Sequence, residues 1–141
     1  MLTPINRSPQ EQGQRRILYV GNDLGPLAAL RAVMRRPEFH IVSCPNRCSA
    51  ILFIKSDIQY DIFLFDLGMR DSAAFELAQL AQSLEHRRHI PIIMAASEID
   101  GSLEELARNA GVAECVSKNG GMSALPNVIR SVLQTGRKVS G

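Results

Sequence analysis

Two charged side chains stand at the ends of separate apolar segments in this 141-residue chain. Asp66 ends the segment YDIFLFD, Lys118 ends ECVSK, and Asp23 lies just beyond ILYV. A carboxylate next to a lysine can be a structural ion pair, or a nucleophile toward a phosphoryl group whose charge the ammonium stabilises. The residue types leave both interpretations open. They favour the structural pair, because ion pairs are common at the edges of sheets.

Five short apolar segments would position these side chains: 17–21, 39–43, 62–65, 90–95 and 113–117. They are continuous rather than alternating, which is typical of parallel strands covered on both faces. Their alternation with helical patterns predicts a single-domain α/β fold, a five-stranded, doubly wound parallel sheet of the flavodoxin-like type. Such sheets bind ligands at the carboxyl ends of their strands, where we expect Asp66 and Lys118 to meet.

Apolar residues at spacings of three and four predict the helices. In the fourth helical pattern the apolar stripe consists of Leu103, Leu106, Ala107 and Ala110. In the fifth it consists of Leu125, Val128, Ile129, Val132 and Leu133. Gly111 and Gly136 are the predicted ends of these two helices.

Composition sets limits on the class of protein. The chain is 45% hydrophobic and 21% charged, with a net charge of +2 and scattered arginine doublets, so we expect no nucleic-acid partner. No apolar run approaches the roughly 20 residues of a membrane span, and three cysteines form no disulfide framework. We therefore expect a cytoplasmic protein without a membrane partner. Residues 1–14 are predicted to be a flexible arm, 15–136 the domain and 137–141 a short tail.

From about residue 15 to 135 the sequence resembles a CheY-like response-regulator receiver domain of two-component signalling, in a divergent form. The resemblance rests on ILYV entering a polar cluster, on YDIFLFDLGM, on PIIMAAS and on GVAECVSK. The spacings agree with an ungapped receiver alignment. Lys118 follows Asp66 by 52 residues (118 − 66), and Ala96 follows it by 30 (96 − 66).

The resemblance implies that Asp66 accepts a phosphoryl group from a histidine of a partner kinase or phosphotransferase, and that Lys118 stabilises its charge. It also implies that Asp66 and the backbone carbonyl of Gly68 bind Mg²⁺. The acidic pair that completes the family's metal site falls on Gly21 and Asn22. Asn22 offers only a neutral oxygen, and Asp23 is either a substitute ligand or the cap of the following helix. We expect Mg²⁺ binding to be weak or absent.

The family's switch residues are changed as well. Its hydroxyl position falls on Ala96, and the adjacent Ser97 is expected to point away, so the hydroxyl is lost or displaced. Its aromatic position falls on Cys115, which we interpret as a core residue. Its proline falls on Asn119, where a cis peptide would cost about 2.5–4 kcal/mol. We therefore expect a trans bond, with Lys118 not reaching Asp66 as it does in the family.

These observations predict a non-enzymatic, stand-alone and atypical receiver domain in a phosphorelay, with Asp66 as an impaired phosphoacceptor. The alternative is a pseudo-receiver, a protein-interaction module that works without phosphorylation. Either would bind a kinase, a phosphotransferase or another signalling protein. The binding face would be built from the fourth helix, fifth strand and fifth helix. We expect a monomer or a weak dimer.

Overall fold

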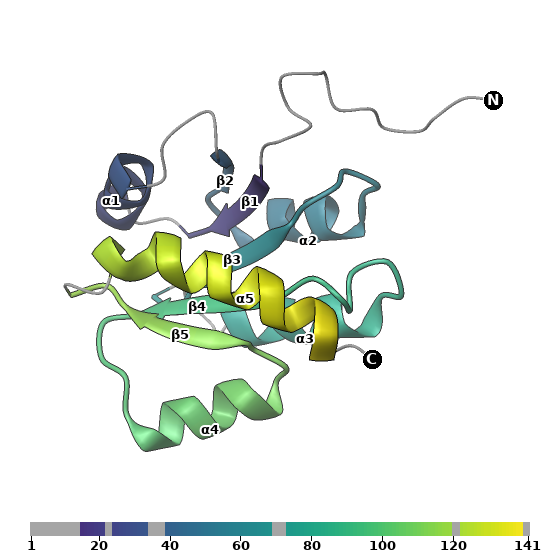
Figure 1. Ribbon diagram of the computed structural model, residues 1–141. Coiled ribbons are helices and arrows are strands. Elements are labelled where there is room, and N and C mark those ends of the chain that lie inside the picture. Colours follow the sequence, from purple (N-terminus) through teal and green to yellow (C-terminus); the bar gives the residue numbers. More distant parts are fainter. Residues whose placement is uncertain (1–14, 22–23, 34–38, 69–72, 120–121, 140–141) are drawn as a thin grey trace.

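The five predicted strands pair into one parallel sheet in the order β2-β1-β3-β4-β5 (Figure 1). The computed structural model describes residues 15–21, 24–33, 39–68, 73–119 and 122–139. The strands are β1 (Arg15–Val20), β2 (Phe39–Cys44), β3 (Ile62–Asp66), β4 (Ile92–Ala96) and β5 (Glu114–Ser117). The helices are α1 (Leu24–Val33), α2 (Arg47–Lys55), α3 (Ala73–Ser83), α4 (Gly101–Asn109) and α5 (Leu125–Val139), which a short 3-10 turn, η2 (Met122–Ala124), precedes. The predicted single-domain, doubly wound α/β fold is confirmed.

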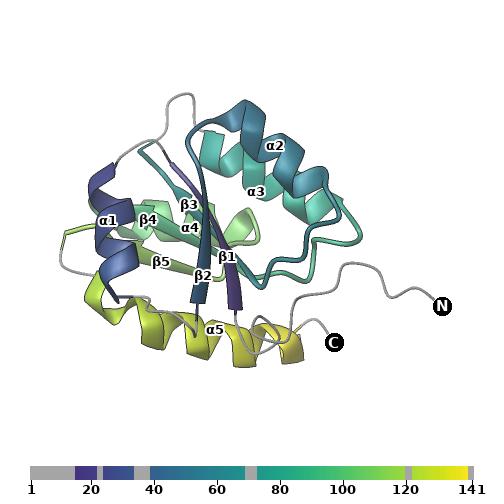
Figure 2. The same cartoon turned by 90° about the horizontal axis from the view of Figure 1, so that it is seen from above.

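The sheet carries an apolar core on each face, which explains why its strands are continuously apolar. One core joins the sheet to α1 and α5 through Leu30 and Ile129, and the other joins it to α2, α3 and α4. The central strand β3 serves both, since Phe63 and Phe65 lie in one core while Ile62 and Leu64 lie in the other. Figure 2 shows α1 and α5 separated from α2 and α3 by the sheet.

The register brings the carboxyl ends of the inner strands together. Val20 pairs with Phe65 between β1 and β3, and Asp66 pairs with Ala95 between β3 and β4. Ala96 pairs with Ser117 between β4 and β5. The residues that follow these strands therefore begin side by side, which is the geometry that places ligand sites at this edge in doubly wound sheets.

Two details of the helices differ from the sequence prediction. Leu106 is 58% exposed rather than part of the packed stripe, whereas Ala107 of α4 and Ala110 directly after the helix pack in the core. α5 continues through Gly136 to Val139, so the predicted end at Gly136 is wrong and residues 137–139 of the predicted tail are helical. A glycine inside a helix costs about 1 kcal/mol, which a long helix tolerates. The turn after α4 does contain Gly111, at a φ of 84°.

No helix in the described part of the chain combines the length and apolar character that crossing a membrane requires. The predicted arm at residues 1–14 lies outside the described residues.

A buried arginine fastens α2 to the rest of the domain. Arg87 is 2% exposed, and it donates hydrogen bonds to the carbonyls of Phe53, Ile54 and Ser56 at the carboxyl end of α2. Its guanidinium lies 5.2 Å from the centre of the Tyr60 ring. Burial lowers the pKa of this guanidinium. The carbonyls and the ring compensate for the lost hydration, as a buried cation requires.

Replacing Arg87 should therefore destabilise the fold. Arg87→Met leaves the last carbonyls of α2 without their buried donor and should lower the free energy of unfolding by about 2–4 kcal/mol, measured by urea denaturation. The exposed neighbour provides the control, because Arg88→Met should change stability by less than about 0.5 kcal/mol. Equal stabilities for the two variants would show that Arg87 does not support α2.

Candidate functional site

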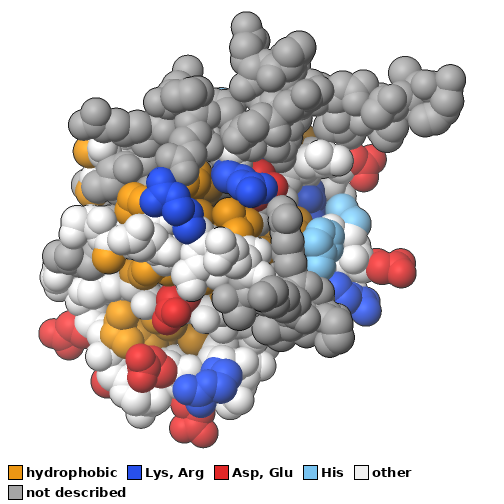
Figure 3. Space-filling view, in the orientation of Figure 1, with side chains coloured by type: hydrophobic (Ala, Val, Ile, Leu, Met, Phe, Trp, Pro, Cys, Tyr) orange, Lys and Arg blue, Asp and Glu red, His pale blue; other side chains and the backbone are white. Residues whose placement is uncertain are grey.

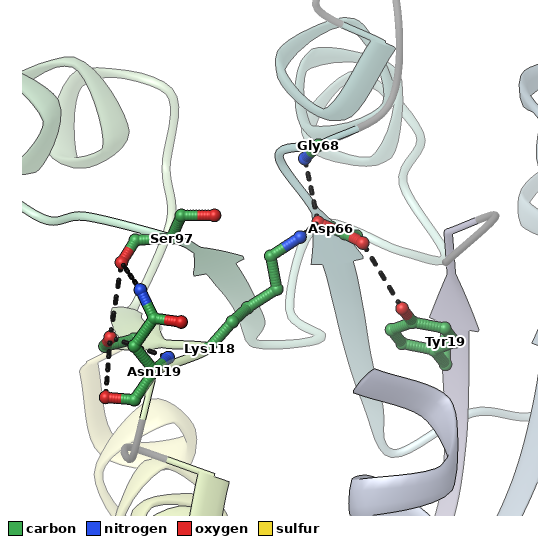
Figure 4. A network of polar contacts seen from close by, with 7 residues as sticks. Tyr19, Asp66, Gly68, Ser97, Lys118 and Asn119 are labelled. Atoms are coloured by element: carbon green, nitrogen blue, oxygen red, sulfur yellow. Dashed lines mark hydrogen bonds and ion pairs between the residues drawn. The ribbon is translucent and has the colours of Figure 1, made fainter. Parts of the chain in front are cut away.

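The carboxylate of Asp66 is the centre of the strand-end site. Asp66 is the last residue of β3 and is 1% exposed. Lys118 Nζ donates to its Oδ1 at 2.7 Å, and the Gly68 amide donates to the same oxygen at 2.8 Å. The Tyr19 hydroxyl donates to Oδ2 at 3.4 Å (Figure 4). A buried carboxylate needs such partners, and here the protein itself supplies them for both oxygens.

Lys118 reaches Asp66 even though asparagine follows it, so the expectation that this contact would be lost is wrong. The Lys118 amide donates to the Ala96 carbonyl at 2.7 Å, which continues the pairing of β5 with β4. Asn119 Nδ2 then donates to the Ser97 carbonyl at 2.9 Å and ties the two strand exits together. The asparagine side chain thereby fixes the path of the chain, and the lysine side chain extends across the sheet edge (Figure 4).

Gly68 leaves room for this ion pair. A Cβ atom there would lie 3.0 Å from Lys118 Nζ and 3.1 Å from Asp66 Oδ1, so a larger residue would press on both charged groups. The contact that the structure records is through the Gly68 amide. Its carbonyl as a metal ligand stays a prediction.

The exit of β1 is filled by an aromatic ring that the sequence analysis did not single out. Tyr19 is fully buried, and Gly21 follows it two residues later with its amide donating to the Cys44 carbonyl at 2.9 Å. A Cβ atom on Gly21 would lie only 2.7 Å from the Tyr19 hydroxyl oxygen. The sequence did contain a signal for this arrangement, because Tyr19 is the one aromatic residue in the segment ILYV and lies on the same face of the strand as Gly21.

The proposed ligands Asn22 and Asp23 lie outside the described residues, so their part in a metal site stays a prediction. Within the described residues, no three acidic, histidine or cysteine side chains gather in a way that could hold a metal ion.

The switch positions lie where the strand pattern predicts. Ala96 ends β4, is 5% exposed and carries no hydroxyl. Ser97 is exposed, and it is its carbonyl that accepts the hydrogen bond from Asn119 (Figure 4). Cys115 is half-buried and packs against the core that contains α4. Burial raises the pKa of the Cys115 thiol, and the nearby carboxylates Glu114 and Glu104 raise it further.

No family model matches the sequence, and no curated protein matches it either. Solved structures do match. A CheY-like response-regulator receiver domain protein from Methanospirillum hungatei has a TM-score of 0.75 at 20% identity, over 89% of this chain and 98% of that one. A chemotaxis response regulator of Vibrio cholerae has a TM-score of 0.75 at 13% identity, over 84% and 98% of the two chains.

A third match is the receiver domain of a sensor histidine kinase from Pseudomonas aeruginosa, with a magnesium ion coordinated in its active-site cleft. Its TM-score is 0.74 at 16% identity, over 86% of this chain and 98% of that one. The chain is thus structurally similar to receiver domains along nearly their whole length. At these identities the similarity establishes the fold.

The ion pair at the site should be visible in stability measurements. Lys118→Met leaves a buried carboxylate without its counter-charge and should lower the free energy of unfolding by about 3 kcal/mol. The double variant Asp66→Asn/Lys118→Met removes both charges. Its loss of unfolding free energy should therefore be smaller than the summed losses of the two single variants, by about 1 kcal/mol or more.

The matched control is Lys55→Met, at an exposed position on α2, which should cost less than about 0.5 kcal/mol. Additive effects of the Asp66 and Lys118 changes in urea denaturation would show that the two charges do not support each other.

Proposed function

We propose that this chain is a receiver-type module of a two-component pathway, acting in the cytoplasm, with Asp66 as an impaired phosphoacceptor. One observation carries the proposal: a buried carboxylate at the carboxyl edge of a receiver-fold sheet, with a lysine ammonium 2.7 Å from its Oδ1. In a receiver fold this pair occupies the position at which phosphoryl chemistry is expected from the sequence resemblance.

The chemistry would be a nucleophilic transfer. An Asp66 carboxylate oxygen attacks the phosphorus of a phosphohistidine on a partner kinase or phosphotransferase, and the bond from phosphorus to the imidazole nitrogen breaks with its electron pair left on that nitrogen. Lys118 stabilises the negative charge that the phosphoryl group brings to the site. The Tyr19 hydroxyl donates to Oδ2 of the unmodified carboxylate, so it stabilises the reactant and thereby raises the barrier. Slow transfer follows.

A cation would neutralise phosphoryl charge if it were bound. The residues in position to hold one are Asp66, the Gly68 carbonyl and, by the sequence prediction, Asn22 or Asp23. This set fits Mg²⁺ poorly, because Mg²⁺ prefers an octahedral set of carboxylate and water oxygens and Gly21 contributes no side chain. We therefore propose weak or absent Mg²⁺ binding at this site.

Incubation with acetyl phosphate and millimolar Mg²⁺ tests the proposal. A fraction of the protein should slowly gain one phosphoryl group by intact mass, and Asp66→Asn should abolish the gain. Asp57→Asn, at an exposed position, is the control and should behave like the unchanged chain. No phosphorylated species at all would reject Asp66 as a phosphoacceptor. Complete phosphorylation within the mixing time would reject its impairment.

The surface of α4, β5 and α5 favours a second function, that of a pseudo-receiver which binds a signalling protein without phosphorylation. Leu106 on α4 is 58% exposed. An open cavity of about 190 Å³ is lined by residues of α4, β5 and the segment between them, including Glu104, Ala107 and Cys115. Figure 3 shows apolar surface near β5 and α4 with acidic side chains around it. Exposed apolar surface rimmed by polar residues is typical of a site that binds another protein.

Leu106→Ser should weaken partner binding without unfolding the domain. If α4 contacts the partner, affinity for a cognate kinase or phosphotransferase should fall about tenfold by calorimetry, which corresponds to about 1.4 kcal/mol. Leu52→Ser, at a site on α2 that is 71% exposed, is the matched control and should leave that affinity unchanged. The opposite pattern, a loss with the Leu52 variant alone, would move the interface to α2.

A further inference from the structure

Tyr19 connects the apolar core to the reactive edge of the sheet. Its ring is fully buried among residues of β1, α1 and α5 that include Ile17, Leu30 and Ile129. Its hydroxyl extends to the carboxyl edge and donates to Asp66 Oδ2 at 3.4 Å (Figure 4). A tyrosine in a strand thus delivers a polar group to a site that its own backbone position does not reach.

Gly21 is the residue that makes this possible. Residues 19 and 21 project to the same side of an extended chain, so a side chain at position 21 would point into the space above the ring. A Cβ atom there would lie 2.7 Å from the Tyr19 hydroxyl oxygen and 3.0 Å from its Cζ. It would also lie 2.8 Å from the Cβ of Asp66. The phenol and any side chain at position 21 therefore exclude each other.

We propose that Tyr19 and Gly21 form a built-in plug that keeps cations away from Asp66. The phenol hydroxyl takes the place that a carboxylate from position 21 would otherwise hold. Such a carboxylate would stand beside that of Asp66, and paired carboxylate oxygens are the ligands that Mg²⁺ and Mn²⁺ prefer. This inference deepens the proposed function, and it rests on that function only in taking Asp66 as the reactive group.

The plug acts through both sterics and charge. The ring is buried in the core, and its hydroxyl lies 3.4 Å from Oδ2 and donates to it, so the phenol takes up space beside this oxygen. On the other oxygen, the Lys118 ammonium lies 2.7 Å away and the Gly68 amide 2.8 Å away. A divalent cation would have to displace one of these donors or approach the lysine charge closely. The carboxylate is therefore satisfied as it stands, and its burial does not depend on a metal ion.

A set of variants tests the plug with Mn²⁺ as the probe, followed by electron paramagnetic resonance titration. The full chain should bind Mn²⁺ weakly. Tyr19→Val opens the space beside Asp66 and should raise Mn²⁺ affinity severalfold, whereas Tyr19→Phe keeps the ring and should raise it less. Tyr19→Val/Gly21→Asp adds the second carboxylate and should bind at least tenfold more tightly than the unchanged chain. Adding Asp66→Asn to this double variant should abolish the gain.

The matched control is Phe39→Val. Phe39 belongs to the same core and is 3% exposed, but its strand, β2, does not pair with β3, so this variant tests loss of aromatic volume alone. Its Mn²⁺ affinity should equal that of the unchanged chain. Gly21→Asp alone should fold less stably and gain no affinity, because the ring still fills the space.

Two results would overturn the plug. One is an unchanged chain that already binds Mn²⁺ as tightly as the double variant. The other is a folded Tyr19→Val variant whose Mn²⁺ affinity is unchanged. This result is decisive even if the Gly21→Asp variants do not fold, because valine introduces no new contact.

Phosphorylation with acetyl phosphate is measured separately. A chain that gains Mn²⁺ affinity but never accepts a phosphoryl group would keep the plug and reject the phosphoacceptor, and the reverse pattern would do the opposite.

Discussion

A carboxylate that is almost completely buried must be given partners by the rest of the fold, and Asp66 imposes that requirement here. With 1% of its surface exposed, it has lost its hydration and depends on the donors around it. The lysine comes from the end of β5, the amide from the loop after β3, and the phenol from β1. The ends of β1, β3 and β5 must therefore lie at the same edge of the sheet, so that their donors can all reach the one buried carboxylate. The parallel register meets this condition.

The same rule operates at the opposite end of the sheet with the opposite charge. Arg87 is buried, and the hydrogen-bond partners of its guanidinium among the described residues are backbone carbonyls at the end of α2 rather than a carboxylate. The two sites use their charges differently. The arginine is enclosed by carbonyls and rings that hold elements together. The aspartate lies at the edge where doubly wound sheets place their chemistry, and two of its three donors are side chains, those of Lys118 and Tyr19.

The shared fold and the local details of the strand-end site are separate matters. The strands and their order are those of a receiver-type fold. At the exit of β1, Gly21 contributes no side chain, and the hydroxyl of Tyr19 from the same strand donates to Asp66. The tyrosine supplies a hydrogen bond to the buried carboxylate, which is therefore satisfied by protein donors on both oxygens. The tyrosine at position 19 and the glycine at position 21 therefore depend on each other, because a side chain at position 21 would collide with the phenol.

The sequence alone was sufficient for the five strands, their parallel arrangement and the placement of Asp66 and Lys118 at one edge of the sheet, but it wrongly predicted that the lysine would fall short of the carboxylate. These features follow from local periodicity and from the rule that the ends of parallel strands share an edge. The tertiary structure decided what depends on distances between side chains from different elements. Asn119 fixes the chain after β5 by donating to the Ser97 carbonyl. Leu106 is exposed instead of packing against the core. The hydroxyl of Tyr19 occupies the position where a side chain at Gly21 would begin. Periodicity specifies which face a side chain takes, but only packing fixes how far it reaches and which atom it meets.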